Sequence, residues 1–294
     1  MADARLTGKI DSAGIGSVAY SPTTLLPSLR RSVWVAFTLA ILNGVFLYGF
    51  PGAARLHYAW PIKPSVNAAF MGAGYLAGVL PTACAVFVVK YWRSIWALMW
   101  SFFAIGTMML VATILHADKF RWHYPLTWIW TAVYVVIPPA VIFLWVLQRR
   151  ADASEPPQDD RLLIMKGFAG VVGIAVSLVA VALVLSPSRM ITHWPWPITP
   201  LLARAFAAWY LQIGVALLFI AARIRQAHEA VIPFAWLTLF NVLLLLLPVF
   251  YSGTIDLHRE SFSVWLALHL VLVAGSLAFL IQAWRLTRES SQSL

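Results

Sequence analysis

Two short stretches, HYAWPIKP at residues 57–64 and HWPWPITP at residues 193–200, carry one pattern, His-x-x-Trp-Pro-Ile-x-Pro. An internal repeat of this kind decides the architecture of a chain, so we predict two copies of one structural unit. The offset that aligns His57 with His193, with at most a small drift, aligns further pairs: Phe70 with Phe206, Trp100 with Trp236, Asp118 with Asp256, and Trp128 with Trp265.

Long apolar runs surround both copies of the pattern. Of the 294 residues, 61% are hydrophobic and only 11% are charged, and the mean hydropathy is +0.81. A soluble domain has about 25% charged residues, so most of this chain must have the bilayer as its solvent. A helix of about 20 apolar residues crosses the hydrocarbon core. Runs of this length predict spans at 32–50, 66–89, 94–115, 126–148, 163–186, 200–222, 230–251 and 262–284.

The apolar runs are continuous rather than alternating, which excludes a transmembrane barrel and leaves helices. We therefore predict an all-α polytopic protein of about eight spans. Each copy of the pattern follows the first helix of a four-span unit. Because four is an even number, the two tandem units have the same orientation and form a parallel repeat rather than an inverted one.

Loop charges predict the orientation. Of the 21 lysines and arginines, 14 lie on the side that holds the N-terminus, six lie on the opposite side, and Arg204 lies near a helix start. Positive residues favour the cytoplasmic side, so both termini are predicted to be cytoplasmic. The predicted parts are a tail (1–31), a first four-helix repeat (32–148), a flexible cytoplasmic linker (149–162), a second repeat (163–286) and a tail (287–294).

The formal net charge of +10 does not indicate nucleic-acid binding, because the basic residues lie in short loops between apolar runs. Cys84 is the single cysteine, which excludes an intramolecular disulfide and a cysteine metal cluster. The expected partners are the lipid bilayer and, in addition, a membrane-protein partner or a second copy in a homodimer.

Histidine, aspartate and tryptophan gather on the predicted non-cytoplasmic side. If the two halves face each other, these side chains converge near the pseudo-axis and bind an external ligand or a divalent metal. The alternative is a set of ordinary polar and aromatic residues in interfacial loops. The candidate ligand-binding residues are His57, His193, Trp60, Trp196, Asp118, Asp256 and Arg204. The candidate metal ligands are His57, His116, His193 and His258.

Other features of the spans limit the chemistry. His269 is the one histidine well inside a span, and a single histidine does not make the pair that a membrane haem needs, so we predict a hydrogen-bonded core residue. The middle of each span lacks Asp and Glu, which argues against proton coupling. Glycines from Gly72 to Gly78 indicate a close helix contact, either between the halves or in a dimer. With no nucleotide-binding loop or nucleophile motif, we assign no catalytic residue and no cofactor.

The segment WPIKP at 60–64, followed by AAFMGAGY at 68–75, resembles a pattern in a family of bacterial eight-span integral membrane proteins with no established activity. The segment WPWPITP at 194–200, followed by Ala203-Arg204, is similar to its partner segment. The resemblance covers both repeats and implies a bacterial inner-membrane location, but it carries over no functional residues. Paired four-helix bundles are also similar to the quinol-interacting membrane anchors of respiratory enzymes, by fold-level analogy alone.

The sequence favours a non-catalytic membrane component or accessory subunit, and we do not expect an enzyme. The first alternative is a transporter or channel for a neutral or lipid-like solute, which the repeat and the mid-span prolines favour. The second alternative is a membrane redox or enzyme subunit with its site on the non-cytoplasmic face.

Overall fold

The computed structural model of the protein describes residues 23–152 and 155–292, and this part of the chain is all-helical, without a β-strand. Within it, eight segments are long and apolar enough to cross a membrane, so the protein is a multi-pass membrane protein. The spans are α1 (Pro27–Gly44) with η1 (Val45–Gly49), α3 (Ser65–Ala83) with η3 (Cys84–Val88), α4 (Trp96–Leu115), α5 (Pro125–Ala151), η6 (Asp160–Leu162) with α6 (Leu163–Leu185), α8 (Pro200–Arg223), α9 (His228–Leu245) with α10 (Leu247–Phe250), and α11 (Glu260–Gln292).

The helices begin and end close to the predicted positions, with two larger differences. Helix α1 begins at Pro27 rather than residue 32, because proline fits the first helical turn, where its missing N–H is not needed. Helix α11 continues past residue 284 to Gln292. Within this extension, Glu289 forms an ion pair with Arg161 (3.2 Å). Most of the predicted N-terminal tail lies outside the described residues.

Short helical pieces connect the spans. They are η2 (Pro51–Ala53), α2 (Ala54–His57), η4 (Trp92–Ser94), η5 (Ala117–Lys119) and α7 (Pro187–His193). Both copies of the His-x-x-Trp-Pro-Ile-x-Pro pattern lie at one end of the helices, which we name the motif end. Residues of the predicted linker, such as Asp152 and Asp159, lie at the opposite end, which we name the linker end.

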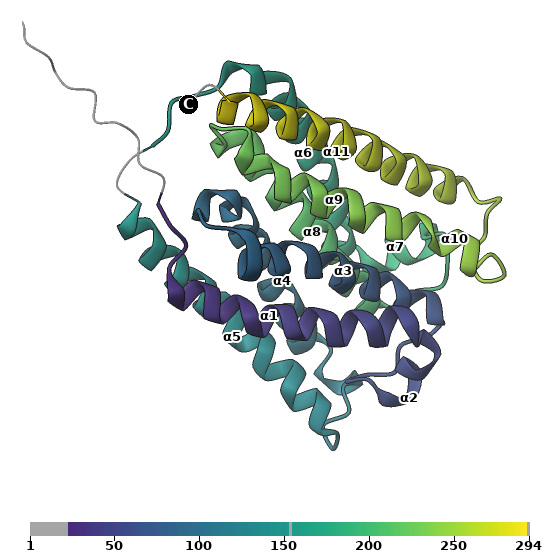
Figure 1. The fold of residues 1–294 in the computed structure, drawn as a ribbon. Helices are drawn as coiled ribbons and strands as arrows, with labels where there is room; N and C mark the ends of the chain where they lie inside the picture. Colours follow the sequence, from purple (N-terminus) through teal and green to yellow (C-terminus); the bar gives the residue numbers. More distant parts are fainter. Residues whose placement is uncertain (1–22, 153–154, 293–294) are drawn as a thin grey trace, which may run out of the picture.

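Helix contacts occur in matching pairs. In the first half α1 packs on α3 and α4 packs on α5, and in the second half α6 packs on α8 and α9 packs on α11. Between the halves, α3 packs against α9 and α8 packs against α4. Figure 1 shows α3, α4, α8 and α9 in the middle of the bundle, with α1 and α5 along one side.

The centre of the bundle is filled by aromatic rings and small residues. The rings of Phe70 and Phe206, which occupy equivalent positions in the two copies, pack with centroids 4.0 Å apart. On α3, Gly74 lies directly against the ring of Trp209 from the second half, and a Cβ atom would overlap this ring. The glycine-rich stretch of α3 therefore makes a contact between the two halves.

Candidate functional site

Each copy of the motif is tied to its own half at the motif end. The backbone N–H of Arg121 donates to the Ala59 carbonyl (2.9 Å), and the backbone N–H of Asp256 donates to the Pro195 carbonyl (3.0 Å). The two halves also meet at this end, because Nδ2 of Asn67 on α3 donates to the Pro197 carbonyl of the second copy (3.0 Å). These bonds satisfy backbone groups of extended segments that no helix can satisfy.

The structure does not bring the predicted histidines and aspartates together. His57 and His193 are both exposed, and Nδ1 of His57 lies 3.5 Å from the hydroxyl of Tyr124. Asp118 pairs with its neighbour Lys119 (2.7 Å) on the surface. Asp256 accepts a hydrogen bond from the backbone N–H of His258 (3.2 Å) in its own turn. Each of these groups is engaged locally or faces outward.

No metal centre forms at the motif end among the described residues, which contain no group of three or more His, Cys, Asp or Glu side chains arranged to hold an ion. His116, a candidate ligand, lies beside Arg204, whose Nη1 is 2.8 Å from His116 Nε2. A guanidinium only donates, so Nε2 is the acceptor in this bond and cannot ligate a metal at the same time. Burial and the neighbouring Arg204 lower the pKa of His116 below its ordinary value.

Trp60 and Trp196 do not line a common outer site either. Each is 2% exposed and belongs to a different aromatic cluster. Trp60 packs against Tyr58 and Trp130 of the first half (centroids 5.1 and 4.8 Å). Trp196 packs against Trp265 of the second half (5.5 Å). Large aromatic rings stabilise the core of each half by burial and edge-to-face contact, which explains why they withdraw from the surface.

The intramembrane histidine, His269, lies in a closed hydrogen-bond network. His269 Nδ1 is 2.7 Å from Asn241 Oδ1, and His269 Nε2 is 3.0 Å from the hydroxyl of Tyr210. Trp265 Nε1 donates to the same hydroxyl (3.1 Å), and Asn241 Nδ2 donates to the Leu237 carbonyl (2.7 Å). Both ring nitrogens are therefore engaged, as expected of a hydrogen-bonded core residue and not of a haem ligand.

A second buried polar cluster lies at the linker end. Arg93 Nη2 pairs with Asp152 (3.1 Å), and Arg93 Nη1 lies 3.7 Å from Glu229 Oε1. The side chains of all three are at most 2% exposed. The guanidinium also lies 4.5 Å above the ring of Trp96. Because Arg93 precedes α4 and Glu229 is in the first turn of α9, this cluster connects the two halves.

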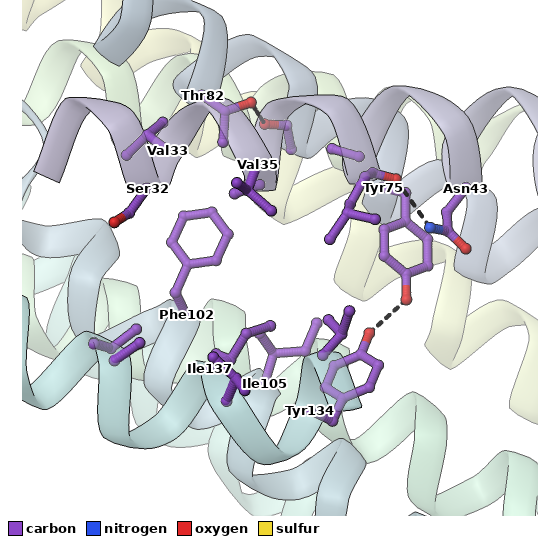
Figure 2. A pocket seen from close by; sticks show the side chains of 18 of the residues that line it. Ser32, Val33, Val35, Asn43, Tyr75, Thr82, Phe102, Ile105, Tyr134 and Ile137 are labelled. Atoms are coloured by element: carbon purple, nitrogen blue, oxygen red, sulfur yellow. Dashed lines mark hydrogen bonds between the residues drawn. The ribbon is translucent and has the colours of Figure 1, made fainter. Parts of the chain in front are cut away.

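One feature without a sequence counterpart is a chamber of about 550 Å³ inside the first half. Its walls come from α1, α3, α4 and α5, and Trp209 and Gln212 of α8 close it on the side of the second half. Figure 2 shows this space, with Val33 and Val35 on one side, Ile137 on the other, and Phe102 pointing into it. The volume lies in the range of ligand pockets, about 300–1,000 Å³.

The chamber has a mouth between α1 and α5. Three of its lining residues on α1 and α5 are exposed: Val35 at 62%, Ile129 at 54% and Val136 at 58%. Helix α1 packs mainly on α3, and α5 packs mainly on α4, so α1 and α5 make little contact with each other. A mouth at this place faces the hydrocarbon of the bilayer rather than water.

Few polar groups interrupt the apolar lining. Tyr75 on α3 and Tyr134 on α5 point toward each other, and their hydroxyls form a hydrogen bond of 2.5 Å (Figure 2). The hydroxyl of Tyr58 donates to Asn43 Oδ1 (3.2 Å). Among the described residues that line the chamber, none is Asp, Glu, Lys, Arg or His. The site is therefore shaped for an uncharged molecule with a large apolar part.

Comparison with known proteins gives no assignment: no family model, no curated protein and no solved structure matches the chain significantly.

Sequence reasoning missed Tyr75, Tyr134 and Gln212. The available signal was that each is a hydrogen-bonding side chain near the middle of an otherwise apolar run. Uncharged polar side chains in a span are a weaker functional signal than the His and Asp residues at the motif end. That Tyr75, Tyr134 and Gln212 line one space follows only from the packing of the helices.

Proposed function

We propose that the protein takes up a neutral, lipid-like molecule from the bilayer into the chamber of its first half, as the binding step of a transporter for such a solute. The observation that carries this proposal is the apolar chamber of about 550 Å³, whose mouth lies between α1 and α5. A molecule that enters there exchanges lipid surroundings for protein surroundings without crossing water.

The chemistry of the lining supports a neutral ligand. A charged head group in this chamber would lose its hydration and find no counter-ion among the described lining residues, which costs several kcal/mol, on the order of 3 or more. A transporter for a neutral solute needs no intramembrane carboxylate for charge compensation. The prediction of a non-catalytic component or accessory subunit stays open beside it, because binding a lipid requires no catalytic group.

We also propose that the fold consists of two tandem four-helix repeats of the same orientation. The paired helix contacts support this, since α3 with α9 corresponds to α8 with α4 when the halves are exchanged. The contact of Phe70 with Phe206 supports it too, because residues at equivalent positions meet at a twofold pseudo-axis. The repeat is not symmetric in its chemistry, since the second half has the His269 network where Tyr134 lies in the first.

The proposed setting is a bacterial inner membrane with both termini and the linker end in the cytoplasm. The excess of basic residues at the linker end supports this orientation. The variants Arg55→Cys and Arg225→Cys, each in a Cys84→Ala background, test it in intact cells. A membrane-impermeant maleimide should label Arg55→Cys and should not label Arg225→Cys. The reverse labelling pattern overturns the orientation.

The binding step is tested by filling the chamber. Gly78 lines it, and a Cβ atom at Gly78 meets nothing within 4 Å, so Gly78→Phe places a ring in the space without a backbone clash. Lipids that co-purify with the protein are identified by native mass spectrometry. We expect wild type to retain a stoichiometric neutral lipid and Gly78→Phe to lose it.

A matched control keeps this test specific. Gly167 on α6 also has nothing within 4 Å of its Cβ position and does not line the chamber. Gly167→Phe should therefore retain the lipid. If wild type carries no bound lipid and binds none on addition, or if Gly78→Phe retains as much as wild type, the proposed function is wrong.

A further inference from the structure

The chamber wall holds a buried amide that has no hydrogen-bond partner. Gln212 on α8 lines the chamber and is 4% exposed. Its Oε1 atom is buried without a partner. Each buried amide group left unpaired in an apolar interior costs about 1–3 kcal/mol. A ligand that enters the cavity can supply the hydrogen bond that such a group on its wall lacks.

Two other polar side chains of the chamber, Tyr75 and Tyr134, lie at a similar depth in the membrane. Gln212 lies just over three helical turns after Pro200, the first residue of α8. Tyr75 lies almost three turns after the start of α3, and Tyr134 lies two and a half turns after the start of α5. At a rise of about 1.5 Å per residue, these side chains are about 18, 15 and 14 Å from the helix starts at the motif end. All three thus lie near the middle of a hydrocarbon core about 30 Å thick.

Gln212 and the tyrosine pair together provide hydrogen-bond donors and acceptors on the wall of the chamber. The Gln212 amide provides an acceptor, Oε1, and two donors on Nε2. The phenol oxygens of Tyr75 and Tyr134 are already bonded to each other (2.5 Å), and each oxygen can still accept a bond. A hydroxyl group matches this set, because it donates one hydrogen bond and accepts others. A plain hydrocarbon leaves the amide unpaired, and a carboxylate or phosphate brings an uncompensated charge.

We infer that the ligand of the chamber is a long-chain lipid alcohol, whose hydroxyl group hydrogen-bonds with Gln212 at mid-membrane depth while its chain fills the apolar space. This inference rests on the proposed function and names the ligand class of the same site. The chain lies among residues between the tyrosine pair and the linker end, such as Val33, Ala85, Leu98, Met99 and Phe102.

The test compares three molecules with the same chain. Full-length protein in detergent, stripped of lipid, is titrated with tritiated hexadecanol, and unlabelled hexadecanol, hexadecane and hexadecanoate (ionised, at alkaline pH) compete with it. One satisfied hydrogen bond is expected to make hexadecanol bind about fivefold more tightly than hexadecane. Hexadecanoate should bind more weakly than hexadecanol, by about tenfold or more.

Variants of Gln212 connect this preference to the amide. Gln212→Leu should bind hexadecane as well as wild type does, and should lose the preference for hexadecanol. The matched control is Gln282→Leu on α11, which makes the same change outside the chamber and should keep the preference. If Gln212→Leu does not accumulate in the membrane, the longer and unbranched Gln212→Met replaces it.

The outcomes separate the two proposals. If none of the three molecules binds, the proposed function fails. If hexadecane binds as tightly as hexadecanol and hexadecanoate binds more weakly than both, the chamber takes up neutral apolar chains, so the inference of a lipid alcohol is overturned while the proposed function stands. If ionised hexadecanoate binds as tightly as hexadecanol, the chamber does not select a neutral ligand, and the proposed function fails as well. A preference for hexadecanol that persists in both Gln212 variants also overturns the role of this amide. Selective binding of hexadecanol that depends on Gln212 supports both.

Discussion

His269 closes a chain of hydrogen bonds that crosses three helices. Asn241 of α9, Tyr210 of α8, and His269 with Trp265 of α11 satisfy one another in the second half. The sequence predicted that His269, as a single intramembrane histidine, is a hydrogen-bonded core residue. It could not show which groups would satisfy the ring, because its partners are far from it along the chain, on two other helices.

Replacing His269 by Leu is expected to lower the free energy of unfolding by about 2–4 kcal/mol, because Asn241 Oδ1 loses its partner in a dry interior and Tyr210 loses another. The measurement is unfolding in mixed detergent micelles, followed by tryptophan fluorescence. Adding Asn241→Leu to the variant should restore part of the loss, since it removes the orphaned amide. The exposed His193→Leu is the control. A loss as large at His193 would contradict this account.

Acidification should weaken the packing of His116 against Arg204. Burial and Arg204 lower the pKa of His116 in the folded protein, so the unfolded chain binds this proton more readily. The His116 ring therefore contributes its full stabilisation above the ordinary histidine pKa of about 6.5. This stabilisation is lost as the pH falls from about 6.5 toward the lowered pKa of His116 in the folded protein. Arg204→Met removes one cause, so an NMR titration should show a higher His116 pKa in this variant. An unchanged or lower value would be evidence against the contact.

At the scale of helices, the sequence predicted the eight spans well because length and hydropathy are local properties. The ends of α1 and α11 differed, because hydropathy reports neither the proline in the first turn of α1 nor the ion pair of Glu289 with Arg161. The glycines of α3 show a similar limit. Their spacing predicted close contact, and the structure assigns that contact at Gly74 to Trp209 of the other half.

Gly74 and Gly78 are one helical turn apart on α3 and provide a matched pair. Gly74→Ala is expected to destabilise the protein by about 1–3 kcal/mol, because the new Cβ overlaps the Trp209 ring and must push α8 away. Gly78→Ala meets open space and should be neutral or stabilising by up to about 1 kcal/mol, because alanine favours a helix. Thermal unfolding in detergent measures both. Equal effects at the two positions would show that Gly74 is not a contact point.

At the scale of the whole molecule, the position of the candidate site could not be read from the sequence. The sequence placed it at the motif end, where His57 and His193 occupy equivalent positions, but both are exposed, and His57 lies beside Tyr124 of its own half. The chamber depends on how far α1 and α5 separate, which is a property of packing. The halves differ most at mid-membrane depth, where Tyr134 and His269 occupy similar places in α5 and α11 and have different partners.

The buried cluster at the linker end determines how firmly the halves hold together. Arg93 belongs to the first half and Glu229 to the second, and they occupy equivalent positions at the same offset as the two copies of the motif. Arg93→Met leaves the carboxylate of Glu229 buried without a cation and leaves Asp152 only its pair with Arg149 (3.4 Å), so we expect a loss of about 3–5 kcal/mol in the free energy of unfolding. Adding Glu229→Gln should recover part of this loss, since one buried charge is removed.

The exposed ion-pairing residue Arg161 gives the control, because Arg161→Met should cost less than about 1 kcal/mol. If Arg93→Met costs no more than Arg161→Met, the halves are held by apolar contacts such as that of Phe70 with Phe206, and the cluster contributes little.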